Sequence, residues 1–193
     1  ISKYENKGVL ADDDKWRDIH GTNDVELIAP TLKAQGFKVT KLCNKTATAM
    51  RIRQELGALA GKVKKNDVVY IHFSCHGQPF EDNNGDEKAG WAESLVPYDA
   101  TMVYQAGTYD GKNHIIDDEL HTYLQKIRAA VGKNGYVCVV IDACHAGSSF
   151  RGEDEEDEPV ARGTTRGFSL NSKLYHPRID ASGNYSIADT KDY

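Results

Sequence analysis

Two short segments of the chain each combine a cysteine and a histidine with small residues. They read Ser74-Cys75-His76-Gly77 and Asp142-Ala143-Cys144-His145. A free thiol is only slightly ionised at neutral pH, so a nucleophilic cysteine gains from an adjacent imidazole. If the segments meet, His76 can take the proton of Cys144, and a glycine N–H beside His76 can face a developing oxyanion. The residue types therefore predict nucleophilic chemistry by Cys144 and His76.

Alternating strands and helices are expected to bring these segments together. Each cysteine–histidine segment directly follows an apolar run that is typical of a buried strand. In an open α/β sheet, functional sites form beyond the carboxyl ends of the strands. The pattern predicts a mostly parallel sheet with helices on both faces. We expect strands over 37–43, 68–73 and 136–142, helices over 22–36, 46–60 and 117–131, and a polar loop over 77–99.

Composition excludes several classes of protein. The chain has 193 residues, and 24 Lys and Arg stand against 29 Asp and Glu, a net charge of −5. No apolar run is long enough for a membrane span, and no basic surplus is present to neutralise nucleic acid phosphates. We therefore expect neither a nucleic acid nor a membrane as a partner. The compartment stays open, since a bacterial protein kept in the cytoplasm and one exported with loss of a leader both fit.

The four cysteines do not indicate a disulfide scaffold or a structural zinc site. No two of them have the CxxC spacing of a zinc knuckle, and the chain is long for a disulfide-dense fold. Cys138 is expected to be a small buried apolar residue in the middle of a strand, and Cys43 is similar. Cys144 differs because it comes just after a strand, in a turn that contains glycine.

The stretch 152–167 is expected to be a flexible linker. It opens with six consecutive acidic residues, 153–158, and like charges repel one another. Without these six the rest of the chain is close to neutral. Three arginines, each followed by glycine, lie in or beside this stretch: Arg151, Arg162 and Arg166.

The two cysteine–histidine segments resemble the catalytic motifs of the caspase-like cysteine peptidases. Among these they are most similar to metacaspases and their bacterial relatives, whose motifs read SGHG and DSCHSG. Cys75 replaces a glycine of the first motif, and Ala146 replaces a serine of the second. The segments 21–24, 91–99 and 116–120 also resemble family segments, in the right order. The resemblance covers about residues 1–152.

The resemblance implies a caspase-like three-layer α/β sandwich and a cysteine endopeptidase with a Cys-His dyad. Cys144 would be the nucleophile and His76 the general acid and base, with the Gly77 and Cys144 N–H groups as the oxyanion hole. Asp142, Asp24 and Ser74 would line the specificity pocket. Two carboxylates in one pocket favour a cation, so cleavage after Arg or Lys is expected.

The family also implies processing within the linker and a second piece of chain. An enzyme that selects arginine could cut its own linker after Arg151, Arg162 or Arg166, and an uncut solvated loop is the alternative. We expect a large-subunit-like core over 1–151 and an incomplete small-subunit-like region over 168–193. Ile1–Tyr4 resembles the end of the family's first strand. A second segment or chain is therefore expected to complete the sheet.

Calcium, which many metacaspases need, is not expected as a cofactor. Asp117 and Asp118 match two of the family's calcium-binding aspartates, but Ala92 and Arg151 stand at two others. The loss of two carboxylates, one of them to a cation, weakens a site for a hard cation. No metal is expected at the site.

Other interpretations of the same residues stay open. Asp24 could stabilise the first turn of its helix, Asp142 could bind loop amides, and Ser74 could be an ordinary hydroxyl at a strand end. The chain could be a catalytically silent, caspase-like interaction or scaffold module. A metal site built from Cys75, His76, Cys144 and His145 is a third possibility, although adjacent residues cannot easily aim at one ion.

Overall fold

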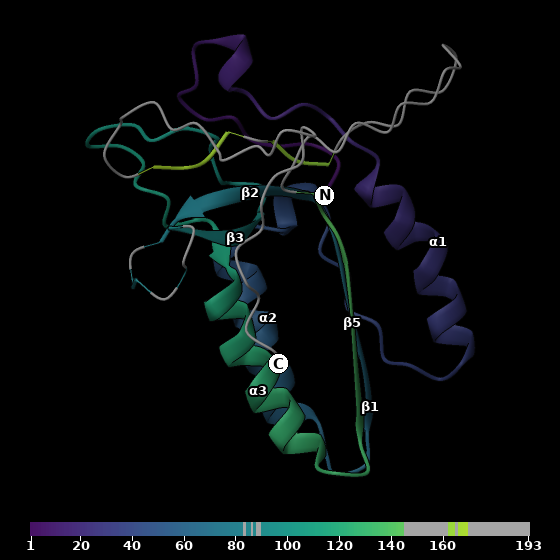
Figure 1. Ribbon diagram of the computed structural model, residues 1–193. Helices are drawn as coiled ribbons and strands as arrows, with labels where there is room; N and C mark the ends of the chain where they lie inside the picture. The colour runs from purple at the N-terminus through teal and green to yellow at the C-terminus, as the bar shows by residue number, and fades with distance from the viewer. Residues whose placement is uncertain (83, 86, 88–89, 145–161, 165, 170–193) are drawn as a thin grey trace, which may run out of the picture.

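The computed structural model describes residues 1–144 except 83, 86, 88 and 89, together with 162–164 and 166–169. Its helices and strands form three layers (Figure 1). Helix α1 lies on one side of strands β1 and β5, and helices α2 and α3 lie together on the other side. The bounds are α1 Gly21–Ala34, α2 Ala49–Lys62, α3 Asp117–Val131, β1 Val68–Ser74 and β5 Tyr136–Asp142. The expected α/β layers are confirmed.

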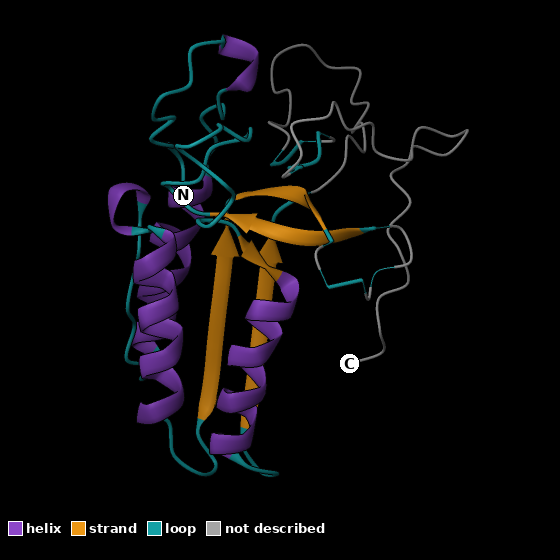
Figure 2. Ribbon diagram, turned by 90° about the vertical axis from the view of Figure 1, so that its left-hand side faces the viewer, coloured by secondary structure: helices purple, strands orange, loops and turns teal. Residues whose placement is uncertain are grey.

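Strands β1 and β5 are parallel neighbours, as the positions of the two motifs required. Their pairing runs in register from Val68 opposite Tyr136 to Ser74 opposite Asp142. Both carboxyl ends therefore lie at the same end of the sheet (Figure 2). The chain segments that leave these two ends carry His76 and Cys144.

A second, antiparallel sheet lies across this end of β1 and β5 (Figure 2). It has the order β2-β3-β4, with β2 His76–Glu81, β3 Trp91–Val96 and β4 Ile115–Ile116. The expected loop over 77–99 is therefore wrong at 77–81 and 91–96, which are strands. Gln78 and Ser94 are buried there because they lie on paired strands, and the Ser94 hydroxyl donates to the Gln78 carbonyl at 2.7 Å.

Two other local expectations differ from the structure. The expected strand over 37–43 is absent, since its end residues bond locally, Phe37 N–H to the Leu32 carbonyl and Cys43 N–H to Thr46 Oγ1. Helix α2 begins three residues later than expected, after Thr48, whose hydroxyl accepts the Arg51 N–H. Short 3₁₀ helices occupy Asp12–Asp14 and Asn44–Thr46.

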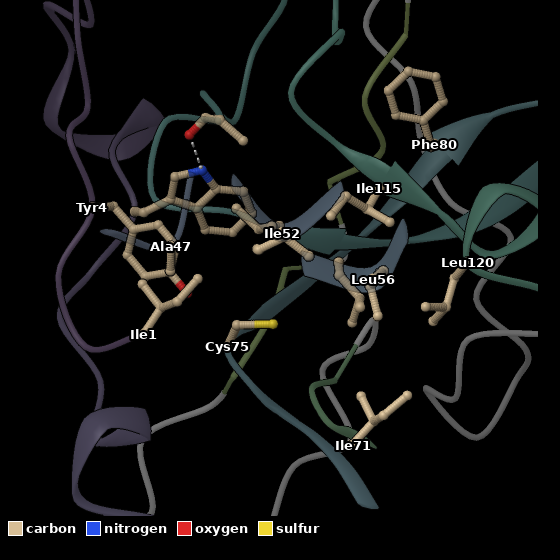
Figure 3. Close-up of a cluster of buried hydrophobic side chains, with 14 of the residues drawn as sticks. Ile1, Tyr4, Ala47, Ile52, Leu56, Ile71, Cys75, Phe80, Ile115 and Leu120 are labelled. Carbon is tan, nitrogen blue, oxygen red and sulfur yellow. Dashed lines mark hydrogen bonds between the residues drawn. The ribbon is translucent and has the colours of Figure 1, made fainter. Parts of the chain in front are cut away.

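The apolar core joins both sheets to the α2–α3 layer. Ile71 of β1, Leu56 of α2, Leu120 of α3, and Phe80 and Ile115 of the second sheet all belong to one buried cluster (Figure 3). The core therefore fixes the antiparallel sheet against the strand ends. None of the helices in the described part of the chain is long and apolar enough to cross a membrane.

Candidate active site

His76 is held tightly on one side of the strand ends. Its backbone N–H donates to Tyr4 Oη at 2.7 Å, and its ring stacks on Trp16 with centroids 4.9 Å apart. Nε2 lies 2.9 Å from the Arg17 carbonyl, a contact that only a protonated Nε2 can make. The hydrogen therefore sits on Nε2 and leaves Nδ1 as the basic nitrogen. Within the described residues, Nδ1 is buried without a hydrogen-bond partner.

The environment keeps this imidazole neutral. Burial lowers the pKa of His76 below its ordinary value, and the carbonyl groups of Arg17 and Arg162 only partly offset that effect. A neutral imidazole can accept a proton from a thiol, whereas an imidazolium cannot. His76 is thus in the protonation state that a general base needs.

The backbone amides beside His76 and at Cys144 converge on a single oxygen atom. That atom is the carbonyl oxygen of Arg162, which accepts the Gly77 N–H at 3.0 Å and the Cys144 N–H at 2.8 Å. Two donors on one carbonyl form the arrangement that stabilises a negative oxygen in acyl transfer. The next residue, Gly163, fits only because it has no side chain, since an added Cβ would lie 1.4 Å from the Cys144 carbonyl oxygen.

The side chain of Arg162 ends among three oxygen-bearing residues, Asp24, Ser74 and Asp142, here called the acidic cluster. Its Nη1 lies 2.7 Å from Asp24 Oδ2 and 2.5 Å from Ser74 Oγ, and it also contacts Asp142 Oδ2. Ser74 Oγ donates in turn to Asp24 Oδ2 at 2.6 Å. Burial would raise the pKa of Asp24, but the hydrogen bonds from Ser74 and Arg162 outweigh it and lower the pKa below its ordinary value.

The chain around Arg162 runs along the free edge of β2. We call residues 162–164 and 166–169 the docked segment. Gly163 and Phe168 form parallel bridges with Gly77 and Phe80 of β2. Thus Arg162, expected in a flexible linker, is held by its side chain, its carbonyl group and the residues that follow. Of the other two candidate arginines, Arg166 pairs with Asp14, and Arg151 lies outside the described residues.

The cysteines differ in their capacity to react. All four are free thiols. Cys75 is buried in the core (Figure 3), and burial raises the pKa of its thiol to about 11. Cys144 is half-buried, so it remains accessible. Cys138 is also half-buried, although full burial was expected, because it lies on β5, whose residues are all partly or fully exposed.

The described residues offer no ready site for a metal. They contain no group of three or more His, Cys, Asp and Glu side chains that could hold an ion. His145, one member of the alternative metal site, lies outside them. At the family's calcium positions, Ala92 is buried in β3 without a donor atom, and Asp118 accepts a hydrogen bond from Asn84. Asp117 Oδ1 is buried and unpartnered among the described residues. Calcium takes six to eight oxygen ligands, which this set does not supply, so the residues present do not fit it.

Several residues around the site were not foreseen from the sequence. Gln78 and His114 are buried beside the docked segment, and Phe168 is buried as part of it. The first two carry no local motif, and only their place on neighbouring strands and loops reveals them. Phe168 carries a weak signal, because it is the one aromatic residue between Phe150 and Tyr175.

Comparisons with known proteins agree with this geometry. The sequence profile of the caspase domain matches residues 4–193. Metacaspase-1 of Plasmodium falciparum is 35% identical over 108 residues, which is 55% of this chain and 16% of the relative. Metacaspase-1 of Eremothecium gossypii is 33% identical over 103 residues, which is 53% of this chain and 20% of the relative. The chain therefore spans about a fifth of the length of these relatives.

A solved structure extends the comparison to the fold. Protein GSU0716 from Geobacter sulfurreducens is 30% identical and superposes with a TM-score of 0.51, over 65% of this chain and 41% of that one. The parallel strands, the helices on both faces and the profile match over nearly the whole length point to one conclusion. The chain belongs to the caspase domain family.

Proposed function

We propose that this protein is a cysteine endopeptidase that hydrolyses peptide bonds after Arg or Lys, with Cys144 as nucleophile and His76 as general acid and base. One observation carries the proposal. The Arg162 carbonyl oxygen accepts two converging N–H groups while its side chain lies in the acidic cluster. This is how the residue before a scissile bond would be bound. Membership of the caspase domain family supports peptidase chemistry.

The proposed reaction uses His76 Nδ1 as the proton carrier. Cys144 gives its thiol proton to Nδ1, and the sulfur attacks the carbonyl carbon of the substrate arginine. The Gly77 and Cys144 N–H groups stabilise the negative oxygen. When the C–N bond breaks, His76 returns the proton to the leaving amine and a thioester remains. Water then attacks the thioester, its proton passes through His76 to the sulfur, and the carboxylic acid is released.

The acidic cluster supports selection of a basic residue. A single nitrogen of Arg162, Nη1, makes all three contacts with Asp24, Ser74 and Asp142. A lysine ammonium is a compact charge with three donors, so it can replace a lone guanidinium nitrogen in this role. An acidic side chain at the same place would face two carboxylates and would be repelled.

Self-processing between Arg162 and Gly163 is part of the proposal. Of the three candidate arginines, Arg162 has its carbonyl group on the two converging amides. Arg166 pairs with Asp14 instead, and its carbonyl oxygen accepts from the Gln78 side chain at 2.9 Å. Cleavage after Arg162 is therefore favoured over cleavage after Arg166.

Hydrolysis of short reporter peptides tests the enzyme itself. We expect turnover of Arg and Lys reporters, none of Asp reporters, and loss of turnover by at least about 1,000-fold in Cys144→Ala and His76→Ala. The matched control is Cys138→Ala, which removes a half-buried thiol in the middle of β5, opposite Tyr70 of β1. Preference for Asp, or hydrolysis that survives Cys144→Ala, would contradict the proposal and leave the scaffold interpretation.

Mass spectrometry of the intact chain tests self-processing. Wild-type protein should yield the fragments 1–162 and 163–193, and Cys144→Ala should stay whole. Arg162→Ala should lose this cut while it keeps hydrolysis of short reporters. A cut at the same bond in Cys144→Ala would assign the processing to another protease.

We also propose that a second segment or chain pairs with β5. Among the described residues β5 pairs only with β1, and Tyr136 and Ile141 are exposed by 63% and 49%. Parallel sheets occur mostly with both faces covered and rarely as two strands alone. Amide hydrogen exchange tests this proposal, because β5 should be protected in a longer form of the protein and exchange quickly in residues 1–193 alone. Equal protection in both would contradict it.

A further inference from the structure

The edge of β2 binds residues of the docked segment beyond Arg162. The Thr164 N–H donates to the Gly77 carbonyl at 3.3 Å, and the Phe168 N–H donates to the Pro79 carbonyl at 2.7 Å. The Glu81 N–H returns a bond to the Phe168 carbonyl at 2.9 Å. The segment thus pairs with the sheet edge through isolated bridges, in the manner of an added strand. In this mode, backbone bonds give affinity and side-chain contacts give specificity.

Phe168 provides the main side-chain contact of this strand. Its ring is 1% exposed and lies 5.2 Å from the ring of Phe80, with an angle of 7° between the planes. Tyr109 meets it edge-on at 5.7 Å, and His114 lies 4.8 Å away. We call these four residues the aromatic cluster. An added Cβ on Gly111 would lie 2.7 Å from both phenylalanine rings, so this glycine leaves room for them.

A series of buried hydrogen bonds also reaches the docked segment beside the aromatic cluster. Tyr109 Oη lies 3.0 Å from His114 Nδ1, and His114 Nε2 lies 2.8 Å from Gln78 Oε1. Gln78 Nε2 then donates to the Arg166 and Met102 carbonyl oxygens, both at 2.9 Å. Gln78 is completely buried, and one of its two donor bonds goes to the docked segment. Arg166 also forms an ion pair with Asp14.

From these contacts we infer a leaving-side binding site. The edge of β2, Gln78 and the rings of Phe80, Tyr109 and His114 bind the chain that follows the scissile bond. Phe168 belongs to that bound chain and positions the Arg162–Gly163 bond at Cys144. The inference rests on the proposed function. It identifies the substrate class as chains with a basic residue before the cut, glycine directly after it and an aromatic residue sixth after it, as in residues 162–168.

A purely structural role for Phe168 is the alternative. In that case its removal would lower stability and affect every reaction of the enzyme alike. A positioning role instead affects only substrates that extend past the cut, because a short reporter ends at the arginine, at Gly77, and does not run along the rest of β2. The ratio between the two reactions therefore separates the alternatives.

The first experiment compares Phe168→Ala with wild type. We expect self-cleavage after Arg162 to slow by at least about ten-fold, while hydrolysis of the short Arg reporter stays within about two-fold or rises as the site is vacated. Leu56→Ala is the matched control, since Leu56 is a buried core residue of α2. It should leave the ratio of the two rates unchanged. A ratio in Phe168→Ala equal to that in wild type would overturn the inference.

The second experiment moves the change into the substrate, where it cannot disturb folding. The enzyme carries Phe168→Ala, and the substrates are peptides of residues 158–171 with either Phe or Ala at 168. The Phe peptide should have a KM lower by at least about five-fold. Equal KM values would overturn the leaving-side site. Complete lack of reporter hydrolysis would instead overturn the proposed function. In that case, fluorescence polarisation would measure the binding of labelled peptides of residues 163–171 to the protein. Tighter binding of the Phe peptide than of the Ala peptide would still support the leaving-side site, and equal binding would overturn it.

Discussion

The acidic cluster and the aromatic cluster bind the same stretch of chain by opposite physical means. At the first, one guanidinium nitrogen meets oxygen atoms of side chains that remain partly open to solvent, with Asp142 46% exposed. At the second, Phe168 is enclosed by rings and almost fully removed from water. Exposed ion pairs contribute little net stability, whereas a buried aromatic side chain contributes several kilocalories per mole, on the order of 3 kcal/mol.

The difference suggests a division of work in the proposed enzyme. An ion pair is selective for side-chain type, because it excludes acidic and apolar residues, but salt screens it and weakens binding. Aromatic packing tolerates related shapes and binds strongly. The acidic cluster would then choose the residue before the cut, and the aromatic cluster would hold the chain in place along β2.

Neutralising the acidic cluster should have the largest effect. In the double variant Asp24→Asn and Asp142→Asn, kcat/KM for short Arg reporters should fall by about 1,000-fold, because both counter-charges of the arginine are lost. The control is Asp14→Asn, which removes the partner of Arg166 and should leave reporter hydrolysis unchanged. An equal loss of kcat/KM in the two variants would mean that the overall negative charge near the site matters and the specific contacts of Asp24 and Asp142 do not.

A methyl group on Gly163 tests the point where the two regions meet. Gly163→Ala should slow self-cleavage by about 100-fold, because the added Cβ would collide with the Cys144 carbonyl and displace the scissile bond. Short reporters should be hydrolysed as before. Gly61→Ala is the matched control, since no atom lies within 4 Å of its added Cβ. Normal self-cleavage of Gly163→Ala by mass spectrometry would contradict the close approach of Gly163 to Cys144.

The sequence predicted the strand ends better than the β2 edge, and the reason is physical. Helix 117–131 and strand 136–142 have continuous apolar patterns that their structure retains. The β2 strand contains Gln78, Pro79 and Glu81, which are typical of loops. Their burial depends on partners remote in sequence, and no local pattern contains that information.

The candidate site divides in the same way. The strand-end positions of His76 and Cys144 followed from motif and topology, and the structure brings their neighbouring amides onto one oxygen atom. The roles of Gln78, His114 and Phe168 could not be read from the sequence, because each depends on contacts between residues far apart in the chain. The Gln78–His114 bond spans 36 positions, and the Gln78–Arg166 bond spans 88. Likewise, nothing local showed that Arg162 would occupy the acidic cluster.

The aromatic cluster should make the fold sensitive to mild acid. Burial lowers the pKa of His114 to about 3, whereas an unfolded histidine titrates near its ordinary value of 6.5. Between these pH values the unfolded chain binds one more proton than the folded one. The free energy of unfolding should therefore fall by up to about 1.4 kcal/mol for each pH unit below 6.5.

Urea denaturation at pH 6.5, 5.5 and 4.5 measures this loss. His114→Gln removes the titration, so its free energy of unfolding should fall less steeply with pH than that of wild type. Variants of the exposed His20 give the matched control, with the wild-type slope retained. Parallel curves for wild type and His114→Gln would show that the buried imidazole is not the acid-sensitive group.

Removal of calcium should have the smallest effect, because the carboxylates of Asp117 and Asp118 differ from those of the acidic cluster. Asp24 has a lowered pKa and an arginine partner, whereas burial and then Asp118 raise the pKa of Asp117. Asp117 Oδ1 is buried without a hydrogen-bond partner among the described residues. Chelation with EDTA should change reporter hydrolysis by less than about two-fold, because a single carboxylate pair is far short of six to eight ligands. The contrary result has three parts: EDTA abolishes the activity, added calcium restores it, and added calcium does not restore it in Asp117→Asn. That result would show that residues outside the described part complete a calcium site at Asp117.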